Sequence, residues 1–119
     1  LLVEIHGGAW SSGDNTMFIS SNRYIASHGF KVASVTYRLA PEHLFPAQIS
    51  DIISAIDLLI EQAEKLGIDK DKIFLLGRSA GGQIALKTAF QLTNEKIKGV
   101  IAIYTPADLI WGYSFPGNP

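Results

Sequence analysis

The stretch that decides the fold runs from residue 72 to residue 90 and reads KIFLLGRSAGGQIALKTAF. The apolar run Lys72–Leu76 predicts a buried strand, and Gly82–Leu92 predicts a helix. Between them stands G-x-S-x-G, and a strand, this motif and a helix in succession are typical of a nucleophile elbow. Such a turn strains its serine, here Ser79, and places the hydroxyl at a helix N-terminus, where developing negative charge is favoured. The stretch therefore predicts acyl transfer through a covalent serine intermediate.

The composition narrows the class of protein. The 119 residues suffice for one domain with one core. The net charge of −1, without a basic block, gives no reason to expect nucleic acid or an anionic membrane as partner. Cysteine is absent, which excludes disulfides, thiolate metal sites and cysteine nucleophiles. No apolar run approaches the roughly 20 residues that span a bilayer. The chain starts on strand residues without a methionine and ends in a loop, so we expect an internal piece of a longer protein.

Strand-like and helical patterns alternate along the rest of the chain. Strands are expected at Leu1–Ile5, Phe30–Tyr37, Lys72–Leu76 and Gly99–Tyr104, and helices at Met17–His28, around the apolar stripe Ile49–Leu66, and at Gly82–Leu92. Gly29 and Gly67 suit helix ends, and Pro46 suits a first helical turn. The stripe is expected to be core throughout. Alternation with apolar, β-branched strands predicts a three-layer αβα sandwich around a mostly parallel sheet.

Two loops with unusual chemistry should meet in this architecture. One is the elbow, and the other is His6–Trp10, which follows the first strand. Sites in open parallel sheets form beyond the carboxyl ends of the strands, where the winding reverses. If the first and third strands are neighbours, both loops lie there, and the local strand order is 2-1-3-4. Adjacent glycines at Gly7 and Gly8 free backbone N–H groups to bind an oxyanion, and the N–H of Ala80 would be a further donor.

With both loops in place, the chain resembles the α/β-hydrolase superfamily, and within it the hormone-sensitive-lipase-like carboxylesterases and lipases. His6–Trp10 (HGGAW) looks like the family's HGGG-type oxyanion motif, with alanine in place of the third glycine. Tyr37–Ala47 (YRLAPEHLFPA) is very similar to its YRLAPE…FPA segment, and Gly77–Gly82 (GRSAGG) matches its GxSAGG elbow. The likeness covers nearly the whole chain, from about Val3 to Leu109.

The resemblance implies a single α/β-hydrolase core domain over residues 1–119, truncated at both ends, that hydrolyses small carboxylic esters without metal or organic cofactor. It implies Ser79 as nucleophile and oxyanion donors at Gly8, Ala9 and Ala80, with Gly7 shaping the turn. The pattern Trp10…Gly13-Asp14 is also similar to kynurenine formamidases and to feruloyl or acetylxylan esterases, so the substrate stays open.

One part of the expected triad is missing. In this fold the triad runs serine, then acid, then histidine along the chain. No histidine follows Ser79, and the later acids are Glu95 and Asp108. Asp108 follows the fourth strand, where a few relatives place their acid; the alternative is that it caps or braces its loop. Without a base, serine is a weak nucleophile at neutral pH, so these residues alone should be nearly inert.

Other side chains have two interpretations each. Trp10 is core filling or the wall of an acyl pocket, and Arg78 braces the elbow or lines a substrate cleft. The aromatic residues of the last loop pack against further structure or line the pocket: Trp111, Tyr113 and Phe115.

The remaining polar residues are expected to be structural. His6 should bond loop backbone, His28 should complement a helix end, and His43 should sit in a proline-flanked loop. Arg38 and Glu42 are close enough to pair, Asp51 could join them, and together they should brace their segment.

Three rival functions remain open. The nearest is cleavage of amides or peptides, such as formamidase chemistry, which a substrate panel would separate. A non-catalytic binding protein on the same fold would lack a working histidine in the remaining sequence. A bare flavodoxin-like binding domain would leave both glycine motifs unexplained, and a phosphate-bearing ligand at the helix N-terminus would favour it.

Overall fold

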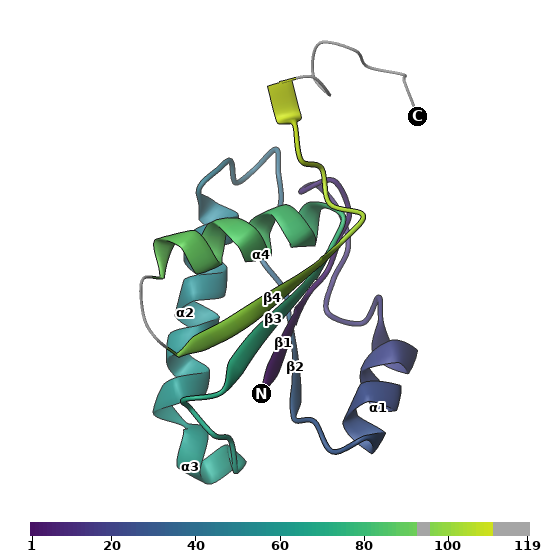
Figure 1. Cartoon of the computed structure of the whole chain (residues 1–119). Helices are drawn as coiled ribbons and strands as arrows, with labels where there is room; N and C mark the ends of the chain where they lie inside the picture. Colours follow the sequence, from purple (N-terminus) through teal and green to yellow (C-terminus); the bar gives the residue numbers. More distant parts are fainter. Residues whose placement is uncertain (93–95, 111–119) are drawn as a thin grey trace.

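The computed structural model describes residues 1–92 and 96–110, and strands and helices alternate along them (Figure 1). In chain order the elements are β1 (Leu2–Ile5), α1 (Ile19–Ser27), β2 (Val32–Val35), α2 (Ala47–Glu61), α3 (Ala63–Leu66), β3 (Ile73–Arg78), α4 (Ala80–Gln91) and β4 (Ile97–Ile103). Among the described residues, no helix is both long and apolar enough to cross a membrane.

The four strands form one parallel sheet in the order β2-β1-β3-β4, as predicted. In the register of the sheet, Glu4 of β1 lies opposite Ser34 of β2 and Leu76 of β3. All strands run the same way, so their carboxyl ends lie along one edge of the sheet. Helices α2 and α4 lie on one side of the sheet and α1 on the other (Figure 1), which gives the expected three layers.

The core lies between the sheet and the pair α2 and α4. Alternate residues of a strand point to opposite faces, so one face of β1 and β3 carries only aliphatic side chains there. They pack with the inward faces of both helices into one buried cluster, whose aliphatic members are Val3, Ile5, Ile49, Ile52, Ile56, Ile73, Leu75, Ile84 and Ala85. This cluster holds α4 against the sheet and thereby fixes the position of its N-terminus.

Two predicted boundaries are wrong. The long amphipathic helix is interrupted at Gln62, where α2 gives way to the four-residue α3. Leu66 lies in α3, outside the core cluster, and is 39% exposed, so the buried stripe stops at Ala63. Pro46 precedes α2 as its N-cap residue and does not lie in the first turn. Gly67 does end α3 in a left-handed conformation, as expected (φ 63°).

The ends of the strands also differ from expectation. The strand β2 covers four residues where eight were predicted, and Phe30 before it is exposed. In contrast, β3 continues to Arg78 and α4 begins at Ala80, so Ser79 alone separates strand from helix. The turn is therefore tighter than the sequence motif required.

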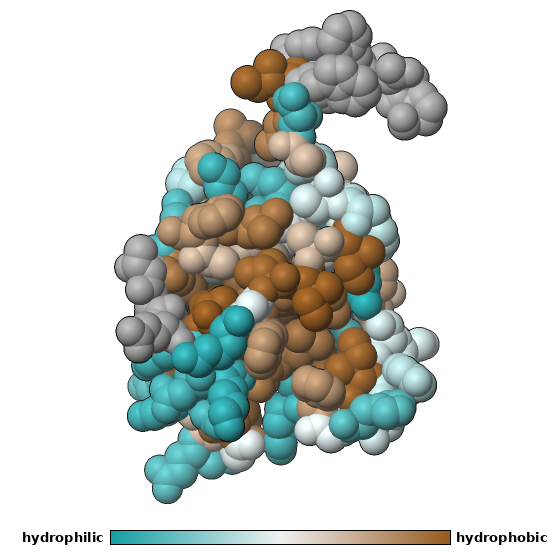
Figure 2. All heavy atoms as spheres, in the orientation of Figure 1, coloured by the Kyte–Doolittle hydropathy of each residue, from teal (hydrophilic) through white to brown (hydrophobic). Residues whose placement is uncertain are grey.

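One side of the described structure carries apolar side chains at its surface. Ile101 and Ile103 of β4, and Tyr104 directly after it, are exposed. Figure 2 shows apolar atoms across the middle of the face where β4 and α4 lie nearest the viewer. The described residues place no further strand beside β4.

Candidate active site

Ser79 occupies the single-residue turn between β3 and α4 with φ 54° and ψ −124°, a conformation that L-residues rarely adopt. A Cβ atom at Gly77 would lie 2.2 Å from the carbonyl oxygen of Gly81, and one at Gly81 would lie 2.2 Å from that of Ile5. Both glycines are therefore needed for α4 to start so close to the strand ends. The N–H of Ser79 donates a hydrogen bond to the carbonyl of Ile103 (3.0 Å), which ties the turn to β4.

The loop after β1 reaches this turn, as the strand order requires. A Cβ atom at Gly7 would lie 2.9 Å from the carbonyl oxygen of Arg78 and 3.1 Å from the Cβ of Ser79. Beyond it, Gly8, Ala9 and Trp10 all have positive φ. The left-handed run turns the backbone sharply back on itself.

Three backbone donors, in the loop after β1 and at the start of α4, lack a protein acceptor in the described part of the chain. Within residues 1–92 and 96–110, the N–H groups of Gly8, Ala9 and Ala80 donate no hydrogen bond to the protein. Backbone N–H groups that lack a partner are strong binding groups for an acceptor from solvent or from a ligand. These three are the donors that the sequence predicted for an oxyanion.

Tyr37, from the YRLAPE block, holds the loop after β1 through the carbonyl groups of that loop. Its hydroxyl donates to the carbonyl oxygens of His6 (3.0 Å) and Gly7 (3.4 Å), and its ring stacks on the His6 ring at 4.3 Å. Burial, and to a lesser degree the charge of Glu4, raise the pKa of Tyr37 to about 12. The hydroxyl therefore stays protonated and keeps donating at any working pH.

The three histidines have structural positions. His6 is fully buried, and its Nδ1 donates to the carbonyl of Gly7 at 2.6 Å, which is the loop bonding that was expected. His28 follows the last residue of α1, with Nδ1 2.9 Å from the carbonyl oxygen of Tyr24. His43 lies in the loop before α2, where its carbonyl accepts a hydrogen bond.

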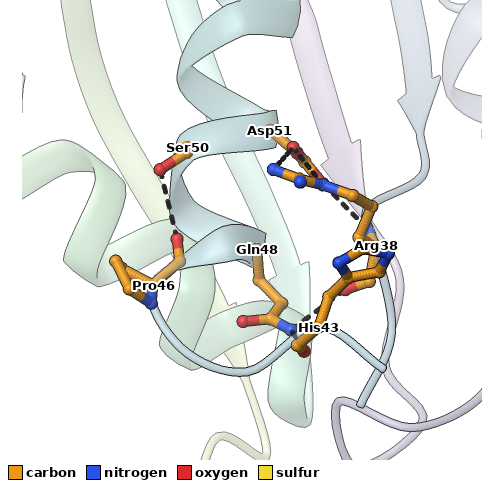
Figure 3. A network of polar contacts seen from close by, with 6 residues as sticks. All are labelled: Arg38, His43, Pro46, Gln48, Ser50 and Asp51. Atoms are coloured by element: carbon orange, nitrogen blue, oxygen red, sulfur yellow. Dashed lines mark hydrogen bonds and ion pairs between the residues drawn. The ribbon is translucent and has the colours of Figure 1, made fainter. Parts of the chain in front are cut away.

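The segment between β2 and α2 is braced by polar contacts (Figure 3). Arg38 donates from Nε (2.9 Å) and Nη2 (2.7 Å) to the carboxylate of Asp51, and the hydrogen bond lowers the pKa of that carboxyl. Gln48 donates from Nε2 to the carbonyls of Arg38 (3.0 Å) and His43 (2.7 Å). Arg38 pairs with Asp51, which was expected to join; the expected pair of Arg38 with Glu42 is wrong, since Glu42 joins no ion pair among the described residues. The sequence analysis missed Gln48, although a glutamine just inside a helix start could have been tested as a loop clamp.

A cleft of about 780 Å³ opens over the elbow. Its lining includes Ser79 and Ala80 from the elbow, Ala9 and Trp10 from the oxyanion loop, and Leu44, Phe45 and Gln83. This volume and this largely apolar lining suit a small organic molecule. Three separate segments of the chain thus line the cleft that also holds Ser79.

Trp10 lies where both interpretations from the sequence would place it. It lines the cleft and also packs against the core cluster. Its indole N–H donates to Oε1 of Gln83 at 3.2 Å, which fixes the ring against α4. Asp108 also lies in the lining. Trp111, Tyr113, Phe115 and Glu95 lie outside the described residues.

Arg78 is not among the residues that line the cleft. It is buried on the opposite side of the elbow, where Nη1 donates to Oε1 of Glu4 at 2.8 Å. Sequence reasoning missed Glu4 as its partner, although a lone carboxylate within an apolar strand was a signal. In the described part of the chain, no three histidine or acidic side chains gather closely enough to hold a metal ion.

Comparisons with known proteins agree with this geometry. Residues 2–115 match the family described as alpha/beta hydrolase fold. An arylesterase of Saccharolobus solfataricus is 40% identical over 82% of this chain and 32% of its own. An arylacetamide deacetylase of Oryctolagus cuniculus is 36% identical over 79% of this chain and 25% of its own. A solved esterase structure from Pyrobaculum calidifontis superimposes with a TM-score of 0.83 at 37% identity, over 87% of this chain and 35% of that one.

The chain therefore spans about a third or less of the length of the curated relatives that it matches. Over that span the likeness covers the sequence and, for the solved esterase, the course of the backbone. The chain belongs to the α/β-hydrolase fold family, in its hormone-sensitive-lipase-like branch.

Proposed function

We propose that the protein is a serine hydrolase that cleaves small carboxylic esters through a covalent acyl-serine intermediate. The observation that carries the proposal is the position of Ser79: a strained one-residue turn at a helix N-terminus, in the lining of an apolar cleft and beside a loop with free N–H groups. The esterases among its relatives support the same reaction class.

In the first half of the reaction, Oγ of Ser79 attacks the ester carbonyl carbon and passes its proton to a general base. The N–H groups of Gly8, Ala9 and Ala80 hold the resulting oxyanion, and each such donor supplies about 3–4 kcal/mol of transition-state stabilisation. The C–O bond to the alcohol then breaks, and the alcohol leaves with the proton from the base.

In the second half, a water molecule adds to the acyl carbon and gives a proton to the same base. The bond from carbon to Oγ breaks, Ser79 recovers its proton, and the carboxylic acid leaves. The general base is a histidine oriented by an acid. None of His6, His28 and His43 lines the cleft, so we place this histidine outside the 119 residues.

The test is labelling of the full-length protein with a fluorophosphonate, whose phosphorus Ser79 attacks while fluoride leaves. We expect one adduct per chain, mapped to Ser79, and none on a Ser79→Ala variant. Ser54→Ala, which changes an exposed serine on α2, should label like the wild type. A folded wild type that stays unlabelled, while a known esterase labels beside it, would contradict the proposal and favour a non-catalytic binding protein.

Amide cleavage is the second candidate, and the similarity to an arylacetamide deacetylase favours it. The same elbow and oxyanion donors serve both reactions, since both pass through a tetrahedral oxyanion. A matched pair of aryl acetate and aryl acetamide, assayed with the same enzyme, separates them. A larger kcat/KM for the amide would reassign the substrate class and leave the role of Ser79 unchanged.

A further inference from the structure

The strained turn at Ser79 needs support from its surroundings. A non-glycine residue with φ 54° and ψ −124° costs on the order of 1–3 kcal/mol and persists only where its neighbours hold it. On the α4 side, the core cluster fixes the helix. On the strand side, the residue before Ser79 is Arg78, the last of β3. Whatever holds Arg78 therefore also holds the start of the turn.

The side chain of Arg78 is held by an unusually complete set of partners. It is 8% exposed; Nη1 donates to Glu4 on β1 (2.8 Å), and Nη2 donates to Oγ of Ser21 on α1 (2.9 Å). Its guanidinium lies over the ring of Phe18, 4.2 Å from the centroid. Glu4 is fully buried and also accepts a hydrogen bond from Ser34 on β2 (3.2 Å). One ion pair thus connects β1, β2, β3 and α1.

The backbone of Arg78 lies against the oxyanion loop, directly beside the nucleophile. A Cβ atom placed on Gly7 would lie 2.9 Å from the carbonyl oxygen of Arg78 and 3.1 Å from the Cβ of Ser79. A shift of Arg78 would therefore change the spacing between the serine and the loop that carries Gly8 and Ala9. Misplacement of reacting groups by about 1 Å can reduce the rate about 100-fold.

We propose that Arg78, anchored by Glu4, is a positioning residue that sets the distance between Ser79 and the oxyanion loop. Arg78 acts through the backbone of the turn and does not contact substrate, because it lies outside the cleft lining. This inference rests on the proposed function, since it assigns a role within the same reaction.

The experiment uses the full-length protein and measures two quantities for each variant: the melting temperature and the rate constant of fluorophosphonate labelling, taken well below that temperature. For a short ester, kcat and KM are measured as well. The variants are Arg78→Met, Arg78→Lys and the double variant Glu4→Leu with Arg78→Met. The control is Lys72→Met, which removes an exposed ion pair with Asp69 at the other end of β3.

We expect Arg78→Met to lower the labelling rate constant and kcat by at least about tenfold, with KM changed by less than about threefold. Arg78→Lys should recover part of the rate because it restores a charge partner for Glu4. The double variant is the decisive one. It should regain thermal stability, because no buried charge is left unpaired, yet still label slowly. Lys72→Met should label like the wild type.

A merely structural role makes the opposite prediction for the double variant, in which stability and labelling rate return together. That result, or wild-type labelling by a folded Arg78→Met variant, would overturn the inference and leave the proposed function intact. An unlabelled wild type would overturn both.

Discussion

The two faces of the sheet are built on different principles. Toward α2 and α4, the strands present only aliphatic side chains, which pack into one buried cluster. Toward α1, the same strands present Glu4, Ser34 and Arg78, and a buried ion pair holds the layers together. Glu4 and Arg78 are buried like the aliphatic cluster, so burial alone does not decide the chemistry.

The difference teaches what each face contributes. Aliphatic packing is strong but non-directional, and it tolerates small displacements of one layer against another. A buried ion pair adds little net stability, but it is satisfied in one geometry only. The apolar face therefore supplies most of the stability of the domain, while the polar face adds a contact between β1 and β3 beside Ser79 that is satisfied in one geometry.

The largest expected effect comes from removing one charge of the polar face. Glu4→Leu leaves the buried guanidinium of Arg78 without a counter-charge and should lower the free energy of unfolding by about 3–5 kcal/mol. Urea unfolding of the full-length protein measures this. Glu61→Leu, on the exposed side of α2, is the control and should change stability by less than about 0.5 kcal/mol. A loss below about 1 kcal/mol for Glu4→Leu would mean that solvent reaches Arg78.

On the aliphatic face, the free energy of unfolding should fall when a buried side chain is shortened. Ile52 is fully buried on α2, and Ile52→Ala should cost about 3 kcal/mol through lost transfer energy and a residual cavity. Leu58→Ala, at a half-exposed position on the same helix, should cost less than about 1 kcal/mol. Urea unfolding measures the loss of stability for both variants. Equal losses for Ile52→Ala and Leu58→Ala would show that the cluster collapses around the cavity.

Making the polar face apolar tests whether the two faces can be exchanged. The double variant Glu4→Leu with Arg78→Met should unfold within about 2 kcal/mol of the wild type, because no unpaired charge remains. A double-mutant cycle with the single variants should give a coupling energy of at least about 4 kcal/mol, because each single variant loses about 3–5 kcal/mol and the double variant at most about 2 kcal/mol. Additive losses would contradict a direct interaction between Glu4 and Arg78.

The smallest effect belongs to the exposed ion pair of Figure 3. The side chains of Arg38 and Asp51 are 51% and 23% exposed, so Asp51→Asn should cost about 1 kcal/mol or less at pH 7. The hydrogen bond from Arg38 lowers the pKa of Asp51 in the folded state. Its contribution is therefore complete above the unfolded value of about 3.9 and disappears as the pH falls through the lower folded value. The stabilities of the wild type and the Asp51→Asn variant should converge as the pH falls below the folded-state pKa of Asp51; a constant difference would contradict this.

Much of the architecture could be predicted from residue patterns. Alternating strand and helix signals predicted the parallel sheet, the expected meeting of the two glycine loops predicted its order, and the glycines at 77 and 81 marked the elbow. The break at Gln62 could not be predicted, since the apolar stripe continues through it without a glycine or proline. The Glu4–Arg78 pair joins residues 74 positions apart, and only the register of β1 against β3 brings them together. Local sequence carries no signal of that register.

The single-residue turn at Ser79 also limits how this site can evolve. No spare residue lies between β3 and α4, so an insertion or deletion there cannot be absorbed by a loop. One added residue would rotate the face that α4 presents to the sheet by about 100°, or slip β3 against both of its neighbours. Changes of length must therefore occur elsewhere in the cleft wall, in the segments around Trp10 and between Ala40 and Phe45. New specificities would arise by remodelling these two segments around a serine that stays in place.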